Sequence, residues 1–206
     1  DLWFSYHVYY KSPDWIGPIV SRALGIPYLI AEGSHAPKRA GGPWALGYDG
    51  TSVALIVADR LLAMTAFDRF CLDQIAPGRV RDLKPFVDAA LFAASSAPLA
   101  PTRSVVTVAT MGDERKKASY ALLAAALKRL KSPLVLRIAG DGPMRFEIEK
   151  MFEGLDVRFE GLVPAERIPA FLSAGDLFAW PGLGEAYGLV FLEAQAAGLP
   201  VVACRD

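Results

Sequence analysis

Short runs of apolar residues alternate along this chain with longer segments whose apolar positions recur every three or four residues. The short runs predict strands at residues 2–6, 28–31, 60–65, 104–109, 134–139, 156–159, 177–180 and 199–203. Because these runs are mainly apolar and do not alternate strictly with polar residues, they are typical of strands buried on both faces of a parallel sheet. The pattern therefore predicts an α/β fold in which strands and helices alternate.

The longer segments predict amphipathic helices at residues 117–130, 144–153 and 165–174. In the first of these, the apolar residues form one stripe along the helix: Tyr120, Leu123, Leu127 and Leu130. A further helix is expected to begin near Gly188 and to stop at Gly198, because glycine followed by proline is typical of a helix C-terminus.

One stretch, residues 93–102, is rich in Ala, Ser and Pro and has no apolar period, which is typical of a linker. It predicts two domains, residues 1–92 and residues 103–206. The chain begins directly in an apolar run, and no helix follows the last one. We therefore expect both domains to be truncated: residues 1–92 as the C-terminal part of the first domain, and residues 103–206 as a second domain incomplete at its C-terminus.

The composition excludes some classes of function. Lys plus Arg and Asp plus Glu number 22 each, and no basic block occurs, so nucleic acid is not an expected partner. No segment reaches the roughly 18 uncharged apolar residues of a membrane-spanning helix, and no signal sequence is evident. These features predict a cytoplasmic location. Cys71 and Cys204 are expected to be small core residues. Four aromatic residues near the N-terminus are also expected in the core, Trp3, Phe4, Tyr9 and Tyr10, with His7 packed among aromatic rings.

The segment 181–200 is the most informative for chemistry. A glycine-rich loop follows the strand expected to end at Trp180, and a helix begins near Gly188. Unpaired backbone N–H groups and the helix dipole at such a start suit a diphosphate. Glu193 lies about one turn into the helix, where its side chain leans back toward the N-terminus and can reach a ribose. Glu185, in the loop, is placed to face a sugar beyond the phosphates.

Glu185 and Glu193, separated by seven residues, resemble the glutamate–seven–glutamate signature of retaining family 4 glycosyltransferases. Residues 137–143, which end in Gly-Asp-Gly-Pro, are similar to the strand and turn of that family's donor-binding domain. Residues 159–164 are similar to its loop that holds the nucleotide base. The resemblance is close over residues 105–203 and looser before them.

The resemblance implies a GT-B architecture, with two Rossmann-like parallel-sheet domains and the donor bound by the second. It implies transfer of a sugar from a nucleoside-diphosphate sugar to an acceptor hydroxyl, with retention and without a cofactor. The acceptor would be a carbohydrate or a lipid-linked compound, and the complete enzyme would associate peripherally with the inner face of the membrane. No Asp-x-Asp pair occurs in the sequence, so a metal-bridged diphosphate is not indicated.

The resemblance also assigns residues to roles. Catalytic roles fall to Glu185, His35 and Lys116; donor-binding roles fall to Glu193, Gly188, Leu189, Arg115, Gly140, Gly142 and Val163. The sequence departs from the family at the phosphate-binding arginine, whose position falls near Thr110 or Gly112. Arg115 is the candidate substitute, since its planar fork suits phosphate. His35 stands two residues later than the family's histidine.

Simpler interpretations remain beside these roles. Gly140 and Gly142 suit a plain turn, Lys116 a solvated helix start, and His35 a capping or core position. A dinucleotide oxidoreductase is disfavoured, because residues 140–145 lack the third glycine of its Gly-x-Gly-x-x-Gly motif. A nucleotide-sugar epimerase of the same architecture and a binding module without turnover both stay open.

Overall fold

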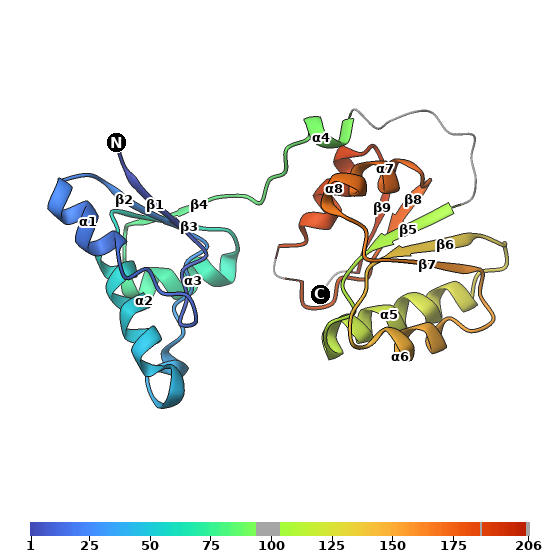
Figure 1. The fold of residues 1–206 in the computed structure, drawn as a ribbon, viewed down its shortest axis with the longest axis horizontal. Coiled ribbons are helices and arrows are strands. Elements are labelled where there is room, and N and C mark those ends of the chain that lie inside the picture. The colour runs from blue at the N-terminus through green and yellow to red at the C-terminus, as the bar shows by residue number, and fades with distance from the viewer. Residues whose placement is uncertain (94–103, 186, 205–206) are drawn as a thin grey trace. The chain divides into compact units, whose positions relative to one another are not determined.

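The computed structural model describes residues 1–93, 104–185 and 187–204. The chain divides into two compact units, Asp1–Pro85 and Phe86–Asp206, and each contains one parallel sheet (Figure 1). Apart from Ala93, the predicted linker lies outside the described residues. The short helix α4 (Ala90–Ala93) belongs to the second unit. Its residue Phe92 is 8% exposed and packs in the core of that unit. The sequence prediction had placed residues 86–92 in the first domain and Ala93 in the linker.

The first unit has a four-stranded sheet in which the strands lie side by side in chain order, all parallel. They are β1 (Trp3–Tyr6), β2 (Tyr28–Ala31), β3 (Arg60–Ala63) and β4 (Val80–Asp82). The connecting helices are α1 (Gly17–Leu24), α2 (Ala45–Val57) and α3 (Ala66–Ile75), with 3-10 turns η1 (Pro37–Arg39) and η2 (Gly42–Trp44) before α2. These helices lie on one face of the sheet (Figure 1). This is expected because each strand is added on the same side of the previous one and such connections are right-handed.

The core of the first unit lies between that face and the helices. Tyr28 and Ile30 of β2, Leu61 of β3 and Val80 of β4 are at most 1% exposed there. Phe4 of β1 points to the opposite face and is 53% exposed, so its prediction as a core residue was wrong. The other three N-terminal aromatics expected in the core are only partly buried: Trp3, Tyr9 and Tyr10.

The second unit has a five-stranded parallel sheet in the order β7-β6-β5-β8-β9. The strands are β5 (Ser104–Val108), β6 (Val135–Ala139), β7 (Val157–Gly161), β8 (Leu177–Ala179) and β9 (Val201–Val202). Along the chain, β6 and β7 are added on one side of β5, and β8 and β9 are then added on its other side. This reversal is the feature of Rossmann-like sheets at which ligands bind, outside the carboxyl ends of the strands.

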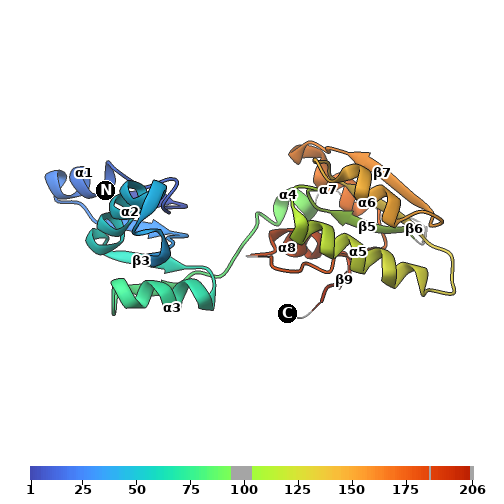
Figure 2. The same ribbon diagram turned by 90° about the horizontal axis from the view of Figure 1, so that it is seen from below.

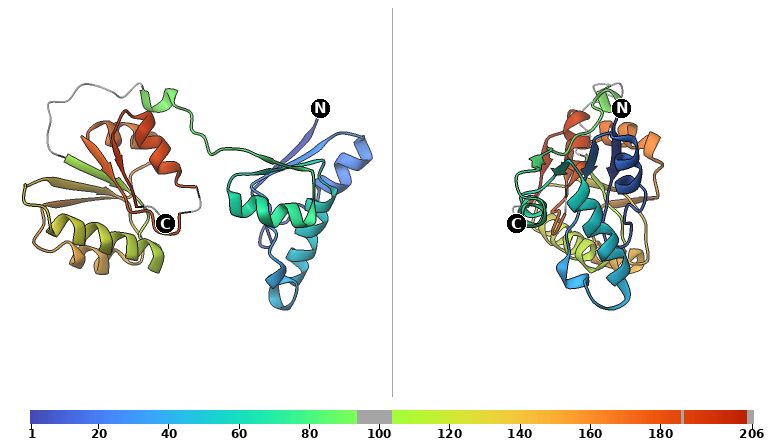
Figure 3. Two further views of the ribbon diagram at one scale, coloured as in Figure 1. Left: turned by 180° about the vertical axis from the view of Figure 1, so that it is seen from behind. Right: turned by 90° about the vertical axis from the view of Figure 1, so that its left-hand side faces the viewer.

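Helices cover both faces of this second sheet. One face is covered by α5 (Glu114–Lys128) and α6 (Arg145–Met151). The other is covered by α4, α7 (Ile168–Ser173), which follows the 3-10 turn η3 (Ala165–Arg167), and α8 (Leu189–Ala196). Figures 1 and 2 show the two layers, and Figure 3 shows them from behind. The two layers leave loops at the carboxyl edge of the strands.

The predicted strands of the second unit are observed, with boundaries shifted by up to two residues. Helix α5 begins earlier than predicted, at Glu114, because the Asp113 side chain caps it by accepting a hydrogen bond from the Lys116 N–H at 3.0 Å. The helix ends at Lys128, so Leu130 lies beyond it and is 54% exposed, contrary to the predicted stripe. Cys204 follows the short β9 and is exposed instead of buried, while Cys71 is partly buried.

A buried hydroxyl joins the two strands at the reversal of the second sheet. Thr107 of β5, fully buried, donates from Oγ1 to the Ala179 carbonyl of β8 at 2.5 Å. We expect Thr107→Val to lower the free energy of unfolding by about 1–2 kcal/mol, because valine keeps the volume but leaves a buried carbonyl without its donor. Urea unfolding followed by the fluorescence of buried Trp180 measures this. Exposed Thr110→Val is the control, and equal midpoints for both variants would contradict the expectation.

Candidate functional site

The loops that follow β5, β6, β7 and β8 meet at the carboxyl edge of the second sheet, beside its reversal. In these loops, and in the helices that begin from them, lie nine of the ten residues to which the sequence assigned a role. They are Arg115, Lys116, Gly140, Gly142, Val163, Glu185, Gly188, Leu189 and Glu193. The tenth, His35, belongs to the first unit.

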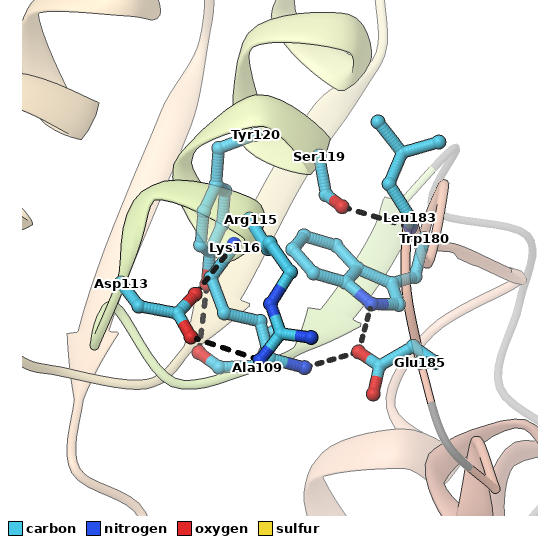
Figure 4. A network of polar contacts seen from close by, with 9 residues as sticks. All are labelled: Ala109, Asp113, Arg115, Lys116, Ser119, Tyr120, Trp180, Leu183 and Glu185. Atoms are coloured by element: carbon cyan, nitrogen blue, oxygen red, sulfur yellow. Dashed lines mark hydrogen bonds and ion pairs between the residues drawn. The ribbon is translucent and has the colours of Figure 1, made fainter. Parts of the chain in front are cut away.

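A network of polar contacts joins the start of α5 to the loop after β8 (Figure 4). Glu185 Oε1 pairs with Lys116 Nζ and accepts a hydrogen bond from Trp180 Nε1 at 3.0 Å. The Lys116 and Glu185 side chains are 26% and 22% exposed, so both charges are partly removed from water. Lys116 Nζ also lies 5.8 Å from the centre of the Trp180 ring. The contact places a cation and a carboxylate next to each other at the sheet reversal.

Two further hydrogen bonds fix this network. Asp113 caps α5, and the hydrogen bond from the Lys116 N–H holds the pKa of the Asp113 carboxyl below its usual value. The Ser119 hydroxyl, buried on the same helix, accepts from the Leu183 N–H at 3.0 Å and so ties the loop after β8 to α5. Lys116 is therefore held by a capped first turn and faces an anchored loop.

Arg115 lies at the rim of the network. Its side chain is 75% exposed, and its guanidinium is 3.8 Å from the Asp113 carboxylate. A Cβ atom on Gly184 would lie 3.3 Å from the Arg115 Cδ atom. Figure 4 shows Arg115 and Lys116 extending from one turn of α5 toward the loop that carries Glu185. An arginine at this position can reach an anion bound beside Lys116.

Next to this network lies a cavity of about 270 Å³ between the ends of β5 and β6, the loop after β7 and α8. Most of its lining is apolar and includes Leu162, Val163 and Val190. Its polar side chains come from Thr110, Asp141 and Glu193. A mainly apolar cavity with a few polar groups is the usual form of a small-molecule site.

The two carboxylates of the cavity differ in their surroundings. Burial raises the pKa of Glu193, which lies on α8. The pKa of Asp141 is lowered, first by the hydrogen bond from the Gly142 N–H at 2.8 Å and then by the Arg145 guanidinium at 3.0 Å. Asp141 already has its partners, whereas a ligand hydroxyl that donates to Glu193 would offset the cost of burying that charge.

Gly140 brings the loop after β6 against the loop after β5. A Cβ atom on Gly140, whose φ is 153°, would lie 1.9 Å from the Ala109 carbonyl oxygen. At Gly142 the corresponding distance, to the Met111 carbonyl oxygen, is 2.5 Å. Close packing of two backbones thus explains both glycines as a turn, and Gly140 also lines the cavity whereas Gly142 does not.

Helix α8 begins beside the cavity with its first turn open. Gly188, the residue before the helix, has a left-handed φ of 59°, and no side chain among the described residues caps the helix. A Cβ atom on Gly188 would lie 2.5 Å from the Phe191 ring, so glycine is required. The Phe191 N–H of this first turn donates to the Gly188 carbonyl at 2.9 Å, whereas the Leu189 N–H has no hydrogen-bond partner within the described residues and is available to an anion.

His35, the remaining predicted residue, follows β2 in the first unit. Its Nε2 lies 3.3 Å from the Tyr48 hydroxyl, and the two rings stack with their centres 6.0 Å apart. Its Nδ1 is buried and has no hydrogen-bond partner within the described residues. The structure gives His35 a defined position, and its catalytic role stays a prediction.

Sequence reasoning missed three residues of the site: Trp180, Ser119 and Asp141. Trp180 was treated only as the end of a strand, and Ser119 lies in a helix whose pattern indicates nothing beyond burial. Asp141 stands inside the Gly-Asp-Gly-Pro turn, which was the one available signal. The other two are identified only by contacts between segments distant in the chain.

Known proteins resemble this chain in sequence and in fold. The family model described as glycosyl transferases group 1 matches residues 102–206, which is 105 of the 206 residues. Sulfoquinovosyl transferase SQD2 of Arabidopsis thaliana is 37% identical over 101 residues, which cover 49% of this chain and 19% of that protein. D-inositol 3-phosphate glycosyltransferase 2 of Catenulispora acidiphila is 30% identical over 232 residues, covering 97% of this chain and 54% of that protein.

Solved structures show the same fold. HepE of Anabaena, crystallised in complex with UDP and glucose, matches with a TM-score of 0.66 at 18% identity, over 97% of this chain and 58% of that one. The chain thus spans less than two thirds of each of these three proteins. None of the helices in the described ranges has the length and apolar character needed to cross a bilayer. The two Rossmann-like sheets have the GT-B form, and the chain belongs to the glycosyl transferases group 1 family.

Proposed function

We propose that this chain is part of a retaining glycosyltransferase and that its second unit binds a nucleoside-diphosphate sugar. The observation that carries the proposal is the meeting, at one sheet edge, of a cation, an open helix start and a cavity with one partly buried carboxylate. These are Lys116, the start of α8 at Gly188 and the Glu193 cavity. Each suits a different part of one nucleotide-sugar molecule.

In this proposal the nucleoside occupies the cavity and the diphosphate lies at the start of α8. Glu193 accepts hydrogen bonds from the ribose hydroxyls, and the backbone at Val163 contacts the base. The N–H groups of Gly188 and Leu189 bind the diphosphate together with Lys116, and Arg115 adds a planar cation from the rim. The sugar then lies next to Glu185, whose carboxylate can accept from a sugar hydroxyl.

The difficult chemical step is departure of the diphosphate. The bond between the anomeric carbon and the diphosphate oxygen breaks, and the acceptor oxygen forms a new bond on the same face of the sugar. The acceptor proton passes to the leaving diphosphate. Lys116 and the α8 amides face the oxygens on which negative charge grows, and groups fixed in advance stabilise such charge most effectively.

The same cationic groups make the proposed binding independent of a metal ion. We expect uridine or guanosine diphosphate to bind this chain with the same affinity, within about twofold, in excess EDTA and in millimolar magnesium. Isothermal titration calorimetry under both conditions is the measurement. A loss of affinity of about tenfold or more in EDTA would contradict metal independence, and no binding of either nucleotide would remove the proposed donor site.

The acceptor and the location rest on the family resemblance. We propose a carbohydrate or lipid-linked acceptor and a location in the cytoplasm, at the inner face of the membrane. The full-length gene product, incubated with UDP- and GDP-sugars and candidate acceptors, should release nucleotide in proportion to glycosylated product. Tight nucleotide-sugar binding without product would favour a binding module, and conversion of the sugar without an acceptor would favour an epimerase.

A further inference from the structure

In the proposed donor site, the carboxylate of Glu185 already pairs with the ammonium group that the diphosphate would use. Glu185 Oε1 contacts Lys116 Nζ, and the two side chains are 22% and 26% exposed. Because water reaches both groups only in part, charges next to them are incompletely screened. A phosphate that binds beside Lys116 therefore also comes close to the negative charge of Glu185.

Several hydrogen bonds hold Glu185 in this position. Its backbone N–H donates to the Gly182 carbonyl at 3.2 Å, and its Oε1 accepts from Trp180 Nε1 at 3.0 Å. Trp180 is fully buried, and the Leu183 N–H, in the same loop, donates to the Ser119 hydroxyl of α5. Moving the carboxylate away from an incoming anion would leave the buried indole N–H without its acceptor, which is costly. The negative charge thus stays in place when a ligand binds.

The second oxygen of the Glu185 carboxylate is open to a ligand. Within the described residues no hydrogen bond or ion pair reaches Oε2, and Figure 4 shows it pointing away from Lys116 and Trp180. An ionised carboxylate can accept about four hydrogen bonds. A sugar on the diphosphate would bring hydroxyl donors to this oxygen, whereas a free diphosphate presents mainly acceptor oxygens.

A nucleotide sugar and a free nucleoside diphosphate differ in charge at this point. In the nucleotide sugar the terminal phosphate is bonded to the sugar and has no second proton to lose. In the free diphosphate the same group can lose a second proton, with a pKa of about 6 as in other phosphate monoesters. At neutral pH the spent nucleotide therefore brings about one more negative charge toward Glu185, and it brings no sugar hydroxyl. Both differences favour the nucleotide sugar.

Lys116 alone does not favour the nucleotide sugar. An ammonium group has three donors, so Lys116 can hold the carboxylate and a phosphate oxygen at the same time. It attracts both ligands, and it attracts the free diphosphate more strongly because that ligand has the larger charge. A carboxylate beside the same cation has the opposite effect. The interaction of Glu185 with the ligand thus changes from hydrogen bonding to repulsion when the sugar is transferred.

We propose that Glu185 makes this site select the nucleotide sugar over the free nucleoside diphosphate, so that the spent nucleotide is released after transfer. The inference rests on the proposed function, which supplies the two ligands. While the sugar is bound, its hydroxyls donate to Oε2 of Glu185, and the diphosphate pairs with Lys116. Once the sugar has left, the Glu185 carboxylate repels the diphosphate, whose charge has grown. Lys116 then keeps Glu185 as its partner when the nucleotide dissociates.

The test is isothermal titration calorimetry with UDP and UDP-glucose, and with GDP and GDP-mannose, on the wild type and Glu185→Gln. For the pair that binds, Glu185→Gln should bind the free diphosphate about tenfold more tightly, because the repelling charge is gone. It should bind the nucleotide sugar no more tightly than the wild type, because the sugar hydroxyls lose a charged acceptor. Stopped-flow displacement should show about tenfold slower dissociation of the free diphosphate.

Two further variants serve as controls. Glu147→Gln removes the carboxylate that pairs with Lys117, the next residue of α5, and should leave both affinities unchanged. Glu185→Asp keeps the charge and should bind the free diphosphate within about threefold of the wild type. Equal changes for both ligands in Glu185→Gln, as expected if Glu185 only neutralises Lys116 in the empty site, or no change for either, would overturn this inference but not the donor site. No binding of any of these nucleotides to the wild type would overturn the donor site, and this inference with it.

Discussion

Replacing Lys116 with alanine is expected to weaken the binding of a nucleoside diphosphate by about 10- to 100-fold, because hydrogen bonds to charged groups are worth roughly 1.5–3 kcal/mol. Lys116 is the cation held at the sheet reversal, partly shielded from water and directed at the loop before α8. The effect should appear in calorimetric titrations with UDP and GDP. It should be at least as large for turnover by the full-length enzyme, since Lys116 also faces the charge that grows on the leaving group.

The neighbouring lysine provides the control. Lys117 pairs with Glu114 and with Glu147 of α6 instead of with Glu185, so Lys117→Ala should leave nucleotide affinity unchanged. Lys116→Ala also removes the ion-pair partner of Glu185, whose carboxylate keeps the hydrogen bond from Trp180 Nε1. The double change Lys116→Ala with Glu185→Gln should therefore recover part of the affinity. Equal affinities for Lys116→Ala and Lys117→Ala would contradict the assignment.

Replacing Glu193 with glutamine is expected to reduce UDP affinity by about tenfold or more, because the ribose hydroxyls lose a charged acceptor. The same substitution should not change the affinity for 2′,3′-dideoxy-UDP, which has no hydroxyls to donate. Calorimetric titration of both nucleotides against the wild type and Glu193→Gln gives the coupling energy between Glu193 and the ribose hydroxyls directly. An equal loss for the two nucleotides would place the ribose elsewhere.

Glu193 should also make stability depend on pH. Burial raises its folded-state pKa above 4.5, so its contribution to stability is fully present below that value and is lost as the pH rises through the folded pKa. Glutamine cannot ionise, so the midpoint of thermal unfolding of Glu193→Gln should fall less than that of the wild type between pH 4 and pH 7. The ionised Glu193 carboxylate therefore lowers the free energy of unfolding at neutral pH, although the proposed ribose binding uses this charge.

The second unit was largely predictable from local patterns, whereas most helices of the first unit were not. Runs such as residues 104–109 and 134–139 are mainly apolar and short, so they identify strands. Helix α2 contains Gly47, Gly50 and Thr51 and has apolar residues on most sides, which hides its period. The order of the strands depends on contacts between distant segments, which no local pattern encodes.

The candidate site shows the same division. Three separate motifs of the family resemblance identified Gly140, Val163 and Glu193, and the structure brings all three to one cavity. The resemblance also identified Lys116 and Glu185, but it did not show that they pair, since they lie 69 positions apart in the chain. His7 was expected to be packed among aromatic residues; it does contact Tyr9, but half of its side chain is exposed and its partner is Glu32. The left-handed backbone of His7, whose φ is 60°, has no signature in the sequence.

The central claim is that one nucleotide-sugar site lies at the carboxyl edge of the second sheet. The most direct test is an amide NMR titration of the chain with UDP. The account predicts shifts of the amides of Gly140, Val163, Gly188 and Leu189, which surround the cavity and the start of α8. Amides at the opposite edge, such as those of Leu134 and Asp156, should not move. Shifts confined to that opposite edge, or no shifts at saturating UDP, would contradict it.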